Sequence, residues 1–322
     1  MIKLAITLSA SFGTFISASS PSFAAQLTFS ETIFNTDWTS AGYGGMRGIG
    51  TGSIDLSGVT GKVNKALLYW HGPTNSNDPN ANSNVSFNAT NIAGANIGFS
   101  DDNFWGFDNG QAYRSDITSL VTGNGIYSLA NFIKPGVEIN GASLLVFFDD
   151  GNTSNNRDVL LFHGNDANFS NPFNPDGWDV TLAGINYDGG DAFINLGVSD
   201  GQTFPDDALV VNGAIIAPSG AVFQGNSVPR GPGGPSNGGL WDIKNYDVTG
   251  LLTPGSNTLN LTTGATNDAL SAVYVAVDLE AGAAPDQPDP NPIPTPALLP
   301  GLIGMGVAAL RKRGQEDNSA EA

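Results

Sequence analysis

The segment Asp116-Ile117-Thr118-Ser119-Leu120-Val121 recurs later in the chain as Asp247-Val248-Thr249-Gly250-Leu251-Leu252. Each copy is followed by glycine and then by an apolar run. Asp and Thr at this spacing bond nearby backbone in tight turns, and the apolar residues beside them are typical of the end of a hydrophobic core. A motif repeated at long range indicates one fold used twice. We therefore expect two tandem domains of one architecture.

Short apolar runs between turn residues occupy the rest of this region. They lie at residues 66–70, 143–148, 159–162, 208–211, 221–223 and 272–277, and Asn-Gly or Asp-Gly pairs separate many of them. These pairs supply the positive φ angles of tight hairpins. The pattern predicts an all-β fold of two antiparallel β-sandwiches. Because Asn, Pro and Asp accumulate at residues 165–175, we expect domains at 25–168 and 169–283.

The motif at residues 247–259 continues as Pro-Gly-x-Asn-x-Leu. In this form it resembles the jelly-roll of sugar-binding domains that are attached to many glycosidases. The resemblance implies that the motif builds the end of a sandwich and does not touch sugar. It concerns the fold alone, because sandwiches host unrelated functions.

The composition indicates an acidic, cysteine-free protein. The chain has 12 Lys and Arg against 30 Asp and Glu, a net charge of -18, and no Cys. Nucleic acid and anionic lipid are therefore poor partners for its main body. Without disulfides, stability must come from a large core or from bound ions.

The N-terminus has the pattern of a signal peptide. Lys3 precedes a mostly apolar stretch at residues 4–16, and Ser22-Phe23-Ala24 places small residues where a signal peptidase reads them. We expect residues 1–24 to be removed on export.

The C-terminus has the pattern of a short membrane segment. A proline-rich linker at residues 284–296 ends in Pro294-Thr295-Pro296, an uncharged run follows at 297–310, and Arg311-Lys312-Arg313 opens the tail at 311–322. As a helix, the run rises only ~21 Å against ~30 Å of hydrocarbon. The basic triplet predicts a cytoplasmic tail, with everything upstream across the membrane.

This order of proline turn, apolar run and basic cluster resembles the PEP-CTERM sorting signal, most closely its cyanobacterial form. The resemblance covers residues 294–313 and implies an exosortase as partner, a membrane protease that cuts near the proline motif and passes the protein to the cell surface or matrix. Thr295 stands where that family has glutamate, and residues 314–322 make a longer tail than usual. Both departures leave the cleavage position open. An ordinary single-pass tail anchor is the alternative.

Catalytic patterns are scarce, and we expect no enzyme. His71 and His163 each follow an apolar run and precede glycine, which is typical of strand ends. Ser236 has the spacing of a nucleophile elbow, but its Gly/Pro-rich surroundings predict neither the strand nor the helix that an elbow needs. The glycines at residues 48–52 resemble a phosphate loop only in letters, since no helix follows them.

One loop is rich in possible calcium ligands. Asp149, Asp150, Asn152 and Asp158 provide oxygens within a short span. Their spacing is neither that of an EF-hand nor that of the nonapeptide calcium repeats, so solvated turn residues are the alternative.

Aromatic residues in loops are the candidates for sugar stacking. Trp105 and Phe107 lie among Asp and Asn, and Trp178 and Trp241 also adjoin turn residues. Any of them could instead plug the end of a sandwich.

These patterns together predict a non-catalytic exported protein of the cell surface or extracellular matrix, anchored in the membrane before processing. The alternative is a carbohydrate-binding module acting on exopolysaccharide, which would need exposed coplanar aromatics beside a groove. A hydrolase, third, would need two carboxylates roughly 5 to 10 Å apart in a cleft.

Overall fold

The computed structural model describes residues 26–101, 106–264 and 267–284. Within them the chain is all-β, as expected: it forms seventeen strands in antiparallel sheets and no α-helix. The expected signal peptide, membrane segment and tail lie outside these residues, as does the linker beyond Ala284. No helix in the described ranges is long and apolar enough to cross a membrane.

The strands fall into two sets that follow each other along the chain. The first set is β1 (Thr28–Tyr43), β2 (Gly52–Leu56), β3 (Lys62–Thr74), β4 (Asn84–Phe87), β5 (Thr90–Ala93), β6 (Ala95–Ser100), β7 (Asn109–Asp116), β8 (Gly125–Ala130) and β9 (Gly141–Asp149). The second set is β10 (Arg157–Ala167), β11 (Asp179–Tyr187), β12 (Ala192–Ser199), β13 (Leu209–Val211), β14 (Ala214–Ala217), β15 (Trp241–Asp247), β16 (Gly255–Thr262) and β17 (Ser271–Glu280).

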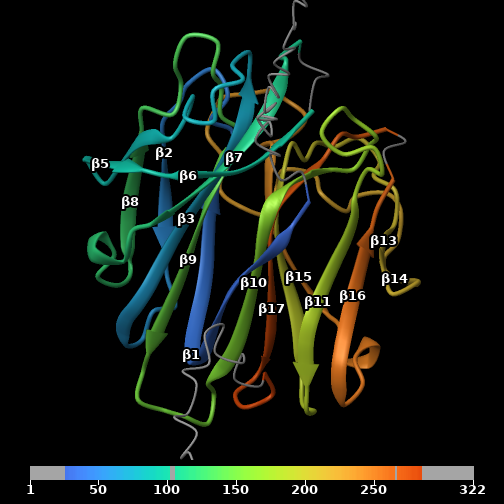
Figure 1. Ribbon diagram of the computed structural model, residues 1–322. Coiled ribbons are helices and arrows are strands. Elements are labelled where there is room, and N and C mark those ends of the chain that lie inside the picture. The colour runs from blue at the N-terminus through green and yellow to red at the C-terminus, as the bar shows by residue number, and fades with distance from the viewer. Residues whose placement is uncertain (1–25, 102–105, 265–266, 285–322) are drawn as a thin grey trace, which may run out of the picture. The chain divides into compact units, whose positions relative to one another are not determined.

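The two sets have the same sheet order. One nine-stranded sheet runs β15-β12-β17-β10-β1-β9-β3-β7-β6, and Figure 1 shows β1 between β9 and β10. Two four-stranded sheets run β2-β8-β4-β5 and β11-β16-β13-β14. Apart from β6, each strand of the first set therefore has a counterpart in the second, β1 with β10 and β9 with β17, for example.

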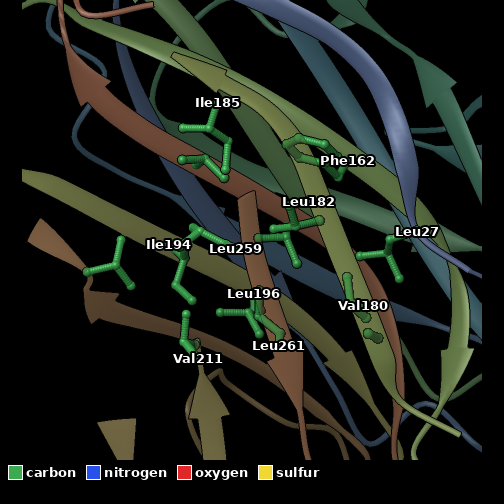
Figure 2. Packing of buried hydrophobic residues seen from close by; sticks show 14 of the residues in the cluster. Leu27, Phe162, Val180, Leu182, Ile185, Ile194, Leu196, Val211, Leu259 and Leu261 are labelled. Carbon is green, nitrogen blue, oxygen red and sulfur yellow. The ribbon is translucent and has the colours of Figure 1, made fainter. Parts of the chain in front are cut away.

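Each half of the long sheet packs on one four-stranded sheet. In the first sandwich, Leu68 of β3 and Leu144 of β9 share a buried cluster with Ile54 of β2 and Phe87 of β4. In the second, side chains from β10, β11, β12, β13 and β16 meet in the same way, as Figure 2 shows. Period-2 alternation of the strands explains this, because every second side chain faces the same layer.

The repeated motif forms the same turn twice. Short 3₁₀ turns follow β7 and β15 at η2 (Thr118–Leu120) and η3 (Thr249–Leu251). The amide of Thr118 donates to Asp116 Oδ1 at 3.0 Å, and that of Thr249 donates to Asp247 Oδ1 at 2.9 Å. Each threonine Oγ1 also accepts a backbone amide of a strand, that of Ala66 within β3 in one copy and that of Ala192 at the start of β12 in the other. The repeat in the sequence is thus a repeat in the structure.

The division between the sandwiches differs from the expected one at residue 168. Strand β10 pairs with β17 and contributes Leu160 and Phe162 to the second core, so the second set of strands begins at Arg157. The change occurs in the loop of residues 150–156, between β9 and β10. The accumulation of Asn, Pro and Asp at residues 165–175 predicts a boundary there, but Asn165, Asn168 and Asn174 are buried.

A third core lies on the opposite face of the long sheet. Leu67 and Tyr69 alternate along β3 with residues of the first core, and they pack with Trp241 and Tyr274 of the second sandwich. The rings of Tyr69 and Tyr274 lie 5.1 Å apart. We call this third core, together with the polar residues at its margins, the seam. It joins the two sandwiches face to face.

Candidate functional site

Polar side chains from both sandwiches meet at one margin of the seam. Arg47 follows β1, Asn140 precedes β9, and Asp200 follows β12. Arg47 donates to Asn140 Oδ1 from Nε at 3.0 Å and from Nη2 at 2.5 Å, and Nη2 also lies 3.1 Å from Asp200 Oδ1. All three side chains are buried, so this ion pair is shielded from solvent and from salt.

The same network continues to a histidine. Asn140 Nδ2 donates to Ser199 Oγ at 2.9 Å, and Ser199 Oγ lies 2.7 Å from His71 Nδ1. Since Asn140 donates to the hydroxyl, the hydroxyl hydrogen is free to point at Nδ1, which then accepts. His71 Nε2 has no hydrogen-bond partner among the described residues. Burial, reinforced by Arg47, lowers the pKa of His71 to about 3.

A serine bonded to a histidine invites comparison with a nucleophile and its base. Nucleophilic catalysis needs a base that can take up a proton at working pH and a path for the substrate. His71 is 0 % exposed, Ser199 is 0 % exposed, and the pKa of His71 lies far below neutrality. The arrangement is suited to linking β3 of the first sandwich to β12 of the second.

A second polar group lies within the seam. Glu31 of β1 is ion-paired with both Lys65 of β3 and Arg114 of β7. Nearby, Tyr69 Oη lies 3.5 Å from His163 Nδ1 of β10. Burial, together with Arg114, lowers the pKa of His163 to about 4, and Glu31 opposes this in part.

Near Arg47, backbone segments of the two sandwiches are in direct contact. The segment of residues 225–239 lies along residues 44–47, with bonds from Gly44 N to Pro229 O and from Gly233 N to Gly45 O. A Cβ on Gly45 would lie 2.5 Å from the Gly231 carbonyl oxygen, and its φ is +64°, so no larger residue fits there. These glycines let two chain segments from different sandwiches touch.

Three buried carboxyls belong to the second sandwich alone. Burial raises the pKa of Asp166 to about 8, that of Asp206 to about 6 and that of Asp268 to about 8. Their hydrogen-bond donors, including Asn174, Phe223 and Gln202, all lie in the same sandwich. The described residues contain no group of three or more His, Asp or Glu placed to hold a metal ion.

The oxygen-rich loop divides into two parts. Asp149, Asp150 and Asn152 accept the amides of Gly151, Asn152 and Ser154, which makes successive Asx turns. Asp158 is buried in β10 and accepts the amides of Asn35, Gly282 and Ala284 instead. The structure thus gives Asp158 a different set of partners from the loop residues with which the sequence grouped it.

Among the described residues, the aromatic side chains that the sequence suggested for sugar stacking do not form an exposed surface. Trp105 lies outside the described residues, and Phe107 is half-buried. Trp178 stacks on Phe223 in the second core, and Trp241 is enclosed in the seam, where its Nε1 donates to Ser143 Oγ at 2.8 Å. Trp178 and Trp241 thus fill cores rather than face solvent.

Sequence reasoning missed the seam network. Arg47, Asn140, Ser199 and Asp200 share no spacing, and Asn140-Gly141 and Asp200-Gly201 read as ordinary turns. The sequence feature that could have pointed to this network is the pair of histidines, each of which follows an apolar run, one in each half of the chain.

Comparison with known proteins adds little. No family model and no curated protein matches the chain. Among solved structures, recombinant N-glycanase F (PNGase F) aligns at 10 % identity with a TM-score of 0.23, over 83 % of this chain and 98 % of that one. A second structure, titled peptide-N(4)-(N-acetyl-β-D-glucosaminyl) asparagine amidase, aligns at 11 % identity with a TM-score of 0.21, over 77 % of this chain and 98 % of that one. Likeness this low carries no argument about fold or function.

Proposed function

We propose that this chain is a non-catalytic exported protein of the cell surface or extracellular matrix, delivered through its PEP-CTERM-like signal and processed by an exosortase. The signal-like N-terminus, the proline motif with its apolar run, and the closing basic triplet motivate the proposal. The acidic, cysteine-free composition is compatible with export, because three hydrophobic cores supply stability without disulfides.

One structural observation supports attachment through the C-terminus. Asp158 Oδ2 accepts the amides of Gly282 at 2.8 Å and Ala284 at 3.2 Å, and Ala283 and Ala284 are buried in the second core. Asp158 thus clamps residues 282–284, and Ala284 is the first residue of the proline-rich linker. Tension on the linker would therefore pass into β10 and β17, two inner strands of the long sheet. Such a connection would suit a surface or matrix component that is held by its C-terminal end.

The C-terminus of the mature protein tests the proposal. We expect intact mass analysis of surface or matrix material to place the end near residues 294–300. Replacing Arg311, Lys312 and Arg313 together by alanine should leave an uncut precursor, because the basic cluster sets the orientation of the segment. An intact C-terminus in surface material from the unaltered chain would leave a plain membrane anchor.

A further inference from the structure

A small cavity lies where the loop between β9 and β10 meets the end of β17. It has a volume of about 210 Å³ and is lined by residues 153–157 together with Glu280 and Ala281. All of these residues except Ala281 carry a hydroxyl, amide or charged side chain. Pockets for drug-sized ligands are larger, at ~300 Å³ or more. The cavity is therefore suited to one small, polar chemical unit.

The loop side of the cavity is fixed by contacts within the protein. Asn155 Nδ2 donates to Asp37 Oδ1 at 2.9 Å, and Asn156 Nδ2 donates to the backbone oxygen and to Oδ1 of Asn35, both at 3.0 Å. Asn156 is 6 % exposed, and its Oδ1 has no hydrogen-bond partner among the described residues. Fixed polar groups lower the entropy cost of binding, and a buried acceptor without a partner is one that a hydroxyl group can satisfy.

Arg157 connects the cavity with the face of the long sheet that carries the seam. It is paired with Glu280 across β10 and β17, so both side chains lie on the same face of the sheet. Asp278 precedes Glu280 by two residues and shares that face. Arg157 Nε donates to Asp278 Oδ1 at 2.5 Å, and Nη2 donates to the backbone oxygen of Asp191 at 2.8 Å. The guanidinium is thus held in one orientation at the edge of the cavity.

Two aromatic rings flank the pair of Arg157 and Asp278. Trp38 Nε1 donates to Asp278 Oδ2 at 3.1 Å, and the guanidinium of Arg157 lies 5.8 Å from the centre of the Phe193 ring. These four residues come from β1, β17, β10 and β12, which are neighbours in the long sheet. Both rings are half-buried, and Trp38 stacks on Phe147 with 6.0 Å between ring centres. They are held in place and still offer apolar surface to a ligand.

A polar cavity beside half-exposed aromatic rings has the chemistry that recognises a pyranose sugar. Such a sugar has hydroxyl groups around its edge and C–H groups on its faces, so it can bond to amides and hydroxyls and pack on a ring at the same time. The charges select among sugars. Arg157 is already paired with Asp278, Glu280 adds a negative charge, and the whole chain carries -18. A sugar acid or sulfate would be repelled, which leaves neutral sugars.

We propose that this cavity and the rings of Trp38 and Phe193 form a binding site for a neutral polysaccharide, with one hexose unit in the cavity and the next unit over the rings. The proposed function names no ligand, so this site goes beyond it. The site uses neither Trp105 nor Phe107, the residues that the sequence suggested for sugar stacking.

Calorimetry with the purified full-length protein tests the site. The neutral probes are cellohexaose, maltohexaose and mannohexaose, with glucose and mannose as single units and hexagalacturonate as the acidic counterpart. We expect at least one neutral hexasaccharide to bind with a Kd of about 1 mM or tighter. Its single unit should bind about tenfold more weakly or worse, because it cannot fill the cavity and cover the rings together. Hexagalacturonate should bind more weakly than the neutral hexasaccharide because of the negative charge of the site.

Substitutions separate the cavity from the rings. Thr153 is exposed, so Thr153→Arg should fold normally, fill the cavity and abolish binding. Trp38→Ala should weaken hexasaccharide binding about tenfold, down to the affinity of the single unit, whereas Trp38→Phe keeps a ring and should retain most of the affinity. Phe204→Ala is the control, because Phe204 is 46 % exposed and follows the opposite end of β12 from Phe193. It should bind as the unaltered chain does.

Three results would overturn the site. The first is that no neutral hexasaccharide binds at concentrations up to about 10 mM. The second is unchanged binding by Thr153→Arg, a variant whose exposed position keeps the test informative even if Trp38→Ala fails to fold. The third is tighter binding of hexagalacturonate than of every neutral probe. None of these measurements involves the C-terminal signal, so their outcome is independent of whether an exosortase processes the chain.

Discussion

Single side chains of this protein hold backbone segments that are far apart in sequence. Asp158 shows this best, because its two carboxylate oxygens accept three amides, from Asn35, Gly282 and Ala284. Sequence proximity grouped Asp158 with Asp149 and Asp150, whose side chains stay within the exposed loop. What separates them is their place in the fold: Asp158 lies inside β10, near both β1 and the end of β17.

Asp158→Asn tests this clamp. The amide keeps one acceptor oxygen and turns an NH₂ group towards backbone donors, so we expect a loss of ~1 to 3 kcal/mol in the free energy of unfolding, measured in urea. Limited proteolysis should also cut sooner near residues 281–284. Asp149→Asn is the matched control, since Asp149 is exposed and makes one local turn bond, and it should cost well under ~1 kcal/mol. Equal losses in the two variants would contradict the clamp.

At the scale of elements, the sequence predicts the repeated turn, but it predicts only in part which side chains of that turn are buried. The apolar residues of the motif are expected at the ends of the cores, but two of them, Leu120 and Leu251, are only half-buried. The residues of the motif that are buried in the cores are Ile117 and Val121 in the first copy and Val248 and Leu252 in the second. In each copy the buried residues therefore flank the 3₁₀ turn, and the leucine that ends it stays half-buried.

Alanine substitutions within one copy separate these roles. Ile117→Ala should cost ~2 to 5 kcal/mol in unfolding free energy, because it leaves a cavity at the end of the first core. Leu120→Ala removes the same number of carbons from a half-exposed position and should cost about half as much or less. A larger loss for Leu120→Ala than for Ile117→Ala in chemical denaturation would contradict this assignment of roles.

At the scale of the whole molecule, local patterns identified strands and missed how they join. Period and turn residues predict sheets, because both depend on neighbouring residues. The seam depends on contacts between residues such as Arg47, His71 and Asp200, which no spacing links. The same dependence on distant contacts explains why the expected domain boundary lies too far along the chain. The loop before Arg157, rich in Asp and Asn, has the composition of a cation site, whereas Asn168 and Asn174 are typical of a boundary by composition and are nevertheless buried.

Fragments of the second sandwich test the revised boundary. A fragment of residues 155–284 contains all eight strands of the second set, including β10 with Leu160 and Phe162. A fragment of residues 169–284, cut at the boundary that the sequence suggested, lacks β10 and leaves one edge of β17 unpaired. We expect the longer fragment to show a cooperative thermal transition and strand-type circular dichroism, and the shorter one to show neither. Since the two fragments share the exposed seam face, that face cannot account for the difference between them. Equally cooperative unfolding of both would place the start of the second sandwich after β10.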